Sequence, residues 1–219
     1  MNFDVVLDNR DFLLDGLRVT VFISALAIVI SLAIGLLVGG VRAYGPRPLA
    51  AVAAVYVDVV RSIPFLVILM WLFFAPPIML GVGLSPLWTA VAALAVHEGA
   101  YFAEIFRAGL LSVRAGQTQA GLAMGMTKML VIRRIVVPQA TIRMLPPLAT
   151  YCGAIVQKSA VTSVIAVEEM TRQAQLLTSV TYRPFEIFTS VMVVYAVIVY
   201  SLIWAVEAVY KRLAPRGAS

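Results

Sequence analysis

Long apolar stretches alternate with short polar segments along this chain of 219 residues. A helix needs about 20 mostly apolar residues to cross the roughly 30 Å of hydrocarbon in a bilayer. The run Val19–Val41 contains no charged residue, and neither does the run Ile187–Val206 near the other end of the chain. Each of these runs is long enough for one membrane-spanning helix.

The apolar stretch between Ser62 and His97 is too long for a single helix. The pair Pro76-Pro77 and the segment Gly81–Pro86 divide it, because proline breaks helices and clusters of glycine and proline mark loops. A further apolar segment, 144–167, is interrupted by Lys158. The pattern therefore predicts an all-α integral membrane protein with a single transmembrane domain over 1–219. Its five helices are expected at about 17–42, 50–74, 87–111, 143–167 and 186–208.

The distribution of lysine and arginine predicts the orientation, because these residues collect in cytoplasmic loops. With the N-terminus outside the cytoplasm, ten of them lie inside: Arg42, Arg47, Arg114, Lys128, Arg133, Arg134, Arg143, Lys211, Arg212 and Arg216. Only Arg10, Arg172 and Arg183 lie outside, with Arg18 at the first boundary. We therefore expect a periplasmic N-terminus, a cytoplasmic C-terminus and a cytoplasmic loop over 112–140.

The composition supports a membrane protein and excludes several other classes. The chain is 62% hydrophobic and 13% charged, whereas soluble chains are about half apolar and a quarter charged. Its net charge of +6 fits cytoplasmic lysine and arginine, and no basic run is interleaved with aromatic residues. We expect membrane lipid around the protein and no nucleic-acid partner. One histidine and one cysteine offer no paired metal ligands, so no metal site is expected.

Motifs for catalysis or nucleotide binding are absent from the sequence. There is no Walker loop, no G-x-S-x-G and no H-E-x-x-H. A membrane-embedded enzyme is therefore disfavoured, and no cofactor is expected. A stand-alone secondary carrier or channel is a further alternative, although five spans without an internal repeat differ from many carrier folds.

Several ionisable residues lie inside the predicted spans, where such groups usually face a bundle interior or a water-filled path. Asp58 and Arg61, and likewise Glu104 and Arg107, are three residues apart and can form pairs within one helix. Glu98 has no obvious local partner, so it is a candidate for a transport path, as are Lys158 and Glu169. The polar segment 159–169 indicates either the lining of a cavity or an extracellular loop that begins one turn early.

The cytoplasmic segment Gly116–Ala140 combines small, polar and basic residues. Its pattern predicts a short helix from Gln117 closed by Gly125, and a second helical stretch that ends before Pro138. Small residues allow another backbone to approach closely, which favours a docking element. An amphipathic linker on the membrane surface is the alternative.

This segment resembles the cytoplasmic signature of permease subunits of bacterial ABC importers, which reads Glu-Ala-Ala, three residues, Gly, nine residues, Ile-x-Leu-Pro. The glycine, isoleucine and proline match at full spacing, while three positions depart from the signature through Gln119, Gly121 and Val137. The matching segment consists of Gln119, Ala120, Gly121, Gly125, Ile135, Val136, Val137 and Pro138.

Other segments are similar to the polar amino acid branch of the same permeases. The strongest is Gly99–Leu110, and further matches occur at 60–65, 114–117, 158–166 and 183–186. The resemblance implies a type I permease fold with five helices and a coupling helix, in a bacterial inner membrane. It implies three partners: a cytoplasmic ABC ATPase dimer that binds ATP, a second permease that is identical or related, and a periplasmic binding protein.

The function implied by this resemblance is import of a polar amino acid or a related small zwitterion. Opines and ectoine-like solutes are the alternative substrates. Gln119, Ala120, Gly121, Gly125, Ile135 and Pro138 are expected to couple the permease to the ATPase. We expect Glu98, Lys158 and Glu169 to line the substrate route, with Arg61 nearer the inner gate.

Overall fold

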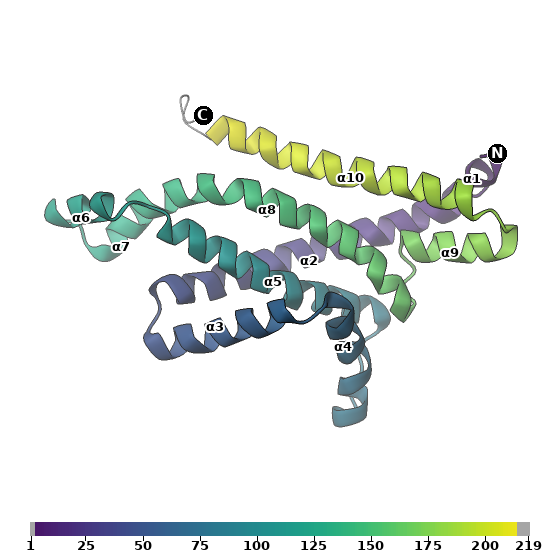
Figure 1. Cartoon of the computed structure of the whole chain (residues 1–219), viewed down its shortest axis with the longest axis horizontal. Helices are drawn as coiled ribbons and strands as arrows, with labels where there is room; N and C mark the ends of the chain where they lie inside the picture. Colours follow the sequence, from purple (N-terminus) through teal and green to yellow (C-terminus); the bar gives the residue numbers. More distant parts are fainter. Residues whose placement is uncertain (1–2, 214–219) are drawn as a thin grey trace.

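The computed structural model describes residues 3–213, and these form helices and no strands (Figure 1). The all-helical prediction is thus confirmed for this part of the chain. The long helices α2, α5, α8 and α10 run along the long axis of the molecule. The elements are α1 (Asp4–Asp8), α2 (Arg10–Tyr44), α3 (Arg47–Ser62), α4 (Phe65–Leu80), α5 (Pro86–Leu111), α6 (Ala115–Ala123), α7 (Lys128–Val131), the π-helical turn η1 (Ile132–Val136), α8 (Val137–Ser159), the 3-10 helix η2 (Ala160–Ile165), α9 (Met170–Thr181) and α10 (Pro184–Leu213).

The most extensive helix packing is between α2 and α5. Ile23 and Ala27 of α2 are fully buried in one cluster with Leu94 and Phe102 of α5. Glycine brings the two backbones together: a Cβ atom on Gly39 would lie 2.5 Å from the carbonyl oxygen of Ala103. This tight contact fixes α5, which carries most of the ionisable residues within the bundle.

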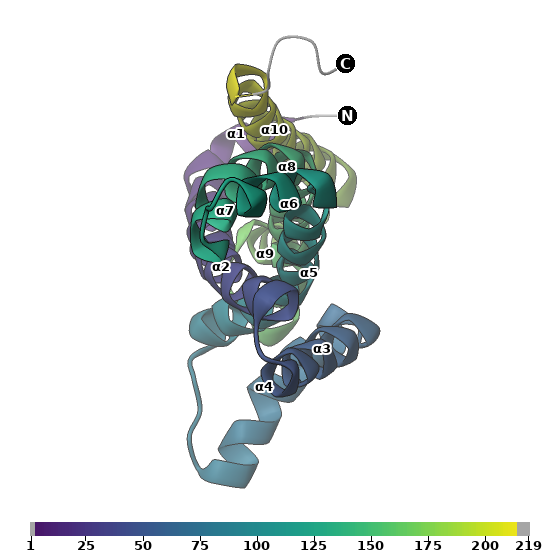
Figure 2. The ribbon, with the colours of Figure 1, turned by 90° about the vertical axis from the view of Figure 1, so that its left-hand side faces the viewer.

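The second predicted span consists of two helices rather than one. α3 and α4 meet at an angle of 105°, with the break at Ile63 and Pro64. Ile63 is extended, as the ring of a following proline requires. Figure 2 shows α4 projecting from the body of the molecule.

The predicted helix end at Pro76-Pro77 is wrong. Both prolines lie inside α4, which continues to Leu80. Two adjacent prolines remove only two backbone hydrogen bonds. The helix instead ends at Gly81, which adopts a left-handed conformation with φ of 66° and donates to the carbonyl of Pro77.

The predicted helix end before Pro138 is also wrong. Residues 132–136 form a π-helical turn, closed by a bond from the Val137 N–H to the carbonyl of Ile132. Pro138 then lies in the first turn of α8, where its missing N–H has no helical partner to lose. The chain therefore enters the membrane-facing helix earlier than position 143.

The first part of the polar stretch after Lys158 forms the 3-10 helix η2, in which Thr162, Ser163 and Ile165 are buried while Val164 is exposed. The hydroxyl groups of Ser159, Thr162 and Ser163 donate to backbone carbonyls three residues earlier, at 2.6–2.8 Å. Ser159 and Thr162 are fully buried, and Ser163 is nearly so. Local hydrogen bonds satisfy these hydroxyls, which explains how the segment is tolerated at this depth.

Within residues 3–213, two helices are long and apolar enough to cross a membrane, namely α2 and α10. Two bent pairs, α3 with α4 and the 128–165 stretch with α9, raise the number to four if each pair is one span. α5 lies outside this set, and its apolar sequence is interrupted by His97, Glu98, Glu104 and Arg107.

Candidate functional site

Three of the four predicted route residues meet where α3, α5 and α8 come together. Arg61 is the last charged residue of α3, Glu98 lies in the middle of α5, and Lys158 lies in the last turn of α8. The bend after α3 and the close packing of α5 hold these elements in place. The cationic groups of Arg61 and Lys158 lie over the ring of Tyr101, which is one helical turn beyond Glu98.

Glu98 is fully buried and has a partner that the sequence did not reveal. Its Oε1 atom lies 2.5 Å from the Lys158 ammonium group and 2.6 Å from Nδ1 of His97. The side chain of Lys158 keeps 30% of its surface exposed. The second oxygen of Glu98, Oε2, is buried and has no hydrogen-bond partner among the described residues. A buried acceptor without a partner costs free energy, so this atom is a candidate for binding a donor.

Tyr101 is the residue that sequence reasoning missed. The Arg61 guanidinium carbon lies 5.1 Å from the ring centroid and the Lys158 ammonium nitrogen 5.2 Å from it, both over the ring. The rings of His97 and Tyr151 lie 5.3 Å and 5.2 Å away. The one sequence signal was position, because Tyr101 follows Glu98 by three residues and shares its helix face.

Arg61 forms no ion pair within the described part of the chain, so the suggested pair with Asp58 is not formed. The pair between Glu104 and Arg107 is formed, and Arg42 of α2 joins it at 2.6 Å. This second charged group ties α2 to the C-terminal half of α5.

Glu169 lies in a different environment from the other three. It is fully buried and is the N-cap residue of α9, accepting a hydrogen bond from the Arg172 N–H at 2.8 Å. Its other oxygen accepts from the hydroxyl of Tyr195 at 2.6 Å and lies 3.5 Å from that of Thr20. Both oxygens are occupied within the subunit, which favours a structural role, and the place of Glu169 on the substrate route stays a prediction.

A hollow of about 330 Å³ lies between α5 and α8, beyond Tyr101 along α5. Its charged lining residues are Glu104 and Arg143. The Arg143 guanidinium group donates to the carbonyl and the hydroxyl of Ser112, at 2.5 Å and 3.0 Å. The charged cluster and this hollow thus follow one face of α5.

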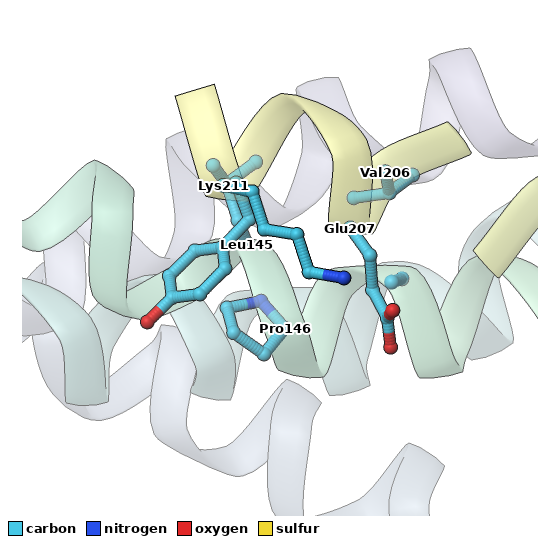
Figure 3. Close-up of a pocket in the computed structure, with 7 residues that line it drawn as sticks. Leu145, Pro146, Val206, Glu207 and Lys211 are labelled. Atoms are coloured by element: carbon cyan, nitrogen blue, oxygen red, sulfur yellow. The ribbon is translucent and has the colours of Figure 1, made fainter. Parts of the chain in front are cut away.

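A separate hollow of about 240 Å³ opens between α8 and α10 (Figure 3). Figure 3 shows Glu207 and Lys211 of α10 beside Pro146 of α8. It shares no lining residue with the cluster around Tyr101. Among the described residues, no group of three or more histidine, cysteine, aspartate or glutamate side chains is arranged to hold a metal ion.

The predicted coupling segment forms one end of the molecule, with α6 at its tip (Figure 1). α6 ends with two characteristic hydrogen bonds, from Gly125 to the carbonyl of Leu122 and from Met126 to that of Gly121. Gly125 takes the required left-handed conformation, with φ of 83°.

The six predicted coupling residues divide into a structural and an exposed set. Gly121 is buried, and a Cβ atom there would lie 2.8 Å from the side chain of Ile135. Gln119, Ala120, Gly125 and Pro138 are exposed. Met124 and Met129 beside them are also exposed, at 82% and 72%. The segment therefore combines a packed interior with an outer surface on which exposed methionines lie beside polar and basic residues.

Comparison with known proteins gives consistent matches over nearly the whole chain. Residues 19–218 match the family described as "Binding-protein-dependent transport system inner membrane component". The chain is 35% identical over 202 residues to the glutamine transport system permease protein GlnP of Escherichia coli (strain K12), covering 92% of each. It is 28% identical over 213 residues to the arginine transport system permease protein ArtQ of Bacillus subtilis (strain 168), covering 97% of each.

Solved structures match in fold. The crystal structure of an amino acid ABC transporter with histidines superposes with a TM-score of 0.90 at 31% identity, covering 97% of this chain and 99% of the other. An inward-facing form of the MetNI methionine ABC transporter gives a TM-score of 0.82 at 20% identity, covering 95% and 99%. The second match concerns the fold alone.

Proposed function

The chain belongs to the family of binding-protein-dependent transport system inner membrane components, and from this premise we propose that it is the permease subunit of an ATP-driven importer for a polar amino acid or a related small zwitterion. The family is a transport component and its fold is that of type I ABC permeases. Relatives named for glutamine and arginine transport support an amino acid as the substrate class.

The proposed arrangement in a bacterial inner membrane has five spans and a periplasmic N-terminus. Four spans are α2, α5, α8 with η2, and α10, and the fifth is the broken pair α3 with α4. The distribution of lysine and arginine supports this orientation, which places α6 and α7 in the cytoplasm.

We propose that α6 and the following turn dock into a cytoplasmic ATPase dimer, which binds the ATP. The exposed Gln119, Ala120 and Gly125 would form the contact, whereas Gly121 and Ile135 hold the segment rigid. A rigid element transmits a movement of the ATPase to the helices that follow it, here η1 and α8. The chain itself needs no cofactor in this scheme.

The remaining proposed partners are a second permease, identical or related, and a periplasmic binding protein. Exposed apolar side chains on α4 support an interface with the other permease, because Ile78, Met79 and Leu80 are 72–80% exposed. Lipid would cover the other apolar faces.

One observation carries the substrate proposal: two cations lie over the ring of Tyr101, and one of them, Lys158, is paired with the buried carboxylate of Glu98. Arg61 and Lys158 supply the positive charge that a substrate carboxylate requires. The unpartnered Oε2 atom of Glu98 supplies an acceptor for the substrate ammonium group once a movement of α8 exposes it. A small zwitterion matches this pair of features better than a purely anionic or cationic solute.

The test is uptake by the complete importer reconstituted in lipid vesicles, with its ATPase and binding protein. Radiolabelled L-glutamine, L-glutamate and L-arginine are supplied outside, and opines and ectoine serve as unlabelled competitors. We expect ATP-dependent accumulation of at least one of the amino acids. Accumulation driven by an ion gradient without ATP, or no uptake of any of the three amino acids, would contradict the proposal.

A Gly125→Asp change tests the coupling part of the proposal. A carboxylate at this exposed, left-handed position should abolish association with the ATPase during purification. Unchanged association would show that the ATPase docks elsewhere.

A further inference from the structure

Two cations from different helices lie over one half-buried aromatic ring. Arg61 belongs to α3, Lys158 to α8 and Tyr101 to α5 between them. A cation within about 6 Å of a ring centroid is attracted by the negative face of the ring. Here that attraction holds two like charges that would otherwise move apart.

The two cations differ in how their charges are balanced. Lys158 shares Oε1 of Glu98 with His97, so its position is fixed by a fully buried carboxylate. Arg61 has no ion-pair partner in the described part of the chain and is exposed. The nearby Asp58 is the remaining acid on this part of α3, and it forms no ion pair with Arg61. The ammonium group of Lys158 is thus held by Glu98, whereas the guanidinium group of Arg61 is free to bind a ligand.

We propose that Tyr101 is a specificity-determining residue: its ring holds Arg61 and Lys158 as a two-cation receptor for the carboxylate group of the substrate. Glu98 is a positioning residue for Lys158. The guanidinium group of Arg61 offers paired N–H donors that match a carboxylate, and the ammonium group of Lys158 adds a third donor. This inference rests on the proposed transport function and assigns the part of the substrate that the permease reads.

The ring of Tyr101, and not its hydroxyl group, attracts the two cations. The only hydrogen bond of the hydroxyl among the described contacts goes to the carbonyl of Arg61 at 3.5 Å, which is the limit of such a bond. Phenylalanine retains the ring face, whereas leucine has a similar bulk without it. The two substitutions therefore separate the proposed role from simple packing.

Tyr151 provides a matched control. Its ring lies 5.2 Å from that of Tyr101 and is likewise half-buried, yet no cation of residues 3–213 lies over it. Loss of the Tyr151 ring removes a comparable amount of aromatic packing without touching the two cations directly.

The experiment measures equilibrium binding of radiolabelled L-glutamine, L-glutamate and L-arginine to the purified permease–ATPase complex without binding protein. We expect Tyr101→Leu to weaken binding of the transported amino acid about fivefold, the upper end of the range for an exposed cation–π contact. Tyr101→Phe and Tyr151→Leu should stay within about twofold of the unaltered complex. Arg61→Gln should weaken binding as Tyr101→Leu does, and the double variant should add little, because both changes disable one receptor.

The proposal would be overturned if Tyr101→Leu bound the amino acid with an affinity within twofold of that of the unaltered complex. It would also be overturned if Tyr101→Phe and Tyr101→Leu lost affinity equally. If Tyr101→Leu does not assemble with the ATPase, Arg61→Gln decides alone, because Arg61 is exposed and its loss does not disturb packing. Uptake by the unaltered importer distinguishes a failure of the proposed transport function from a failure of the proposed role of Tyr101. Absence of ATP-driven amino acid uptake rejects the proposed function, whereas uptake with unchanged binding in the variants rejects only the role of Tyr101.

Discussion

The carboxylate of Glu98 and the ammonium group of Lys158 lie 2.5 Å apart, although 60 residues separate them in the chain. The carboxylate is fully buried, whereas the lysine side chain is 30% exposed. This contact joins α5 to the end of α8, close to the point where α8 changes into η2. The difference in burial between the two side chains has a direct consequence for the stability of the protein.

Lys158→Met should destabilise the protein more than Glu98→Gln does. The first change leaves a buried carboxylate without its cation, which costs about 3–5 kcal/mol. The second leaves a partly exposed lysine that water can reach, so its cost is lower. The double variant should recover most of the loss. Thermal midpoints of the detergent-solubilised complex provide the measurement, and a smaller loss for Lys158→Met than for Glu98→Gln would contradict the burial of Glu98.

Glu169→Gln should lower the thermal midpoint without changing which amino acid is transported. Glu169 caps α9 and accepts from the Tyr195 hydroxyl, and loss of such a cap costs about 1 kcal/mol. The neighbouring Glu168 is exposed, so Glu168→Gln is the matched control and should leave the midpoint unchanged. A changed substrate preference in Glu169→Gln would return this residue to the transport route.

Gly39→Ala should destabilise the contact between α2 and α5, whereas Gly40→Ala should not. The new methyl group on Gly39 would lie 2.5 Å from the Ala103 carbonyl oxygen and 2.8 Å from the Phe106 Cβ atom. Such overpacking costs about 1–3 kcal/mol. Nothing lies within 4 Å of a Cβ atom on Gly40, and alanine there gains up to about 1 kcal/mol of helix propensity. Equal thermal midpoints for the two variants would be incompatible with this packing.

Gly125→Val should reduce both stability and association with the ATPase. The residue has φ of 83°, a conformation that costs a side chain with a Cβ atom about 1–2 kcal/mol. Gly81→Val is the control, because Gly81 has φ of 66° and equally open surroundings. Gly81→Val should lower the thermal midpoint by a similar amount and leave ATPase association intact. Copurification measures association, and an equal loss in both variants would indicate a general folding defect instead of a lost docking site.

Features that depend on neighbours in the chain were predictable from the sequence. The helical class follows from long apolar runs, and the turn at Gly125 follows from a glycine after a short helix. The pair of Glu104 with Arg107 follows from their spacing of three residues, and the structure contains it. The proline pair in α4 misled the same kind of reasoning, because local rules do not say whether a helix can continue past two lost hydrogen bonds.

Tertiary structure alone decided which ionisable groups share an environment. The sequence marked Arg61, Glu98, Lys158 and Glu169 as unusual because charge is costly in an apolar span. It could not assign their partners, since those partners lie on other helices. Folding brings Lys158 to Glu98 and places Tyr101 beneath both cations. The same folding turns Glu169 toward Tyr195, because a buried carboxylate must find donors wherever the packed helices supply them.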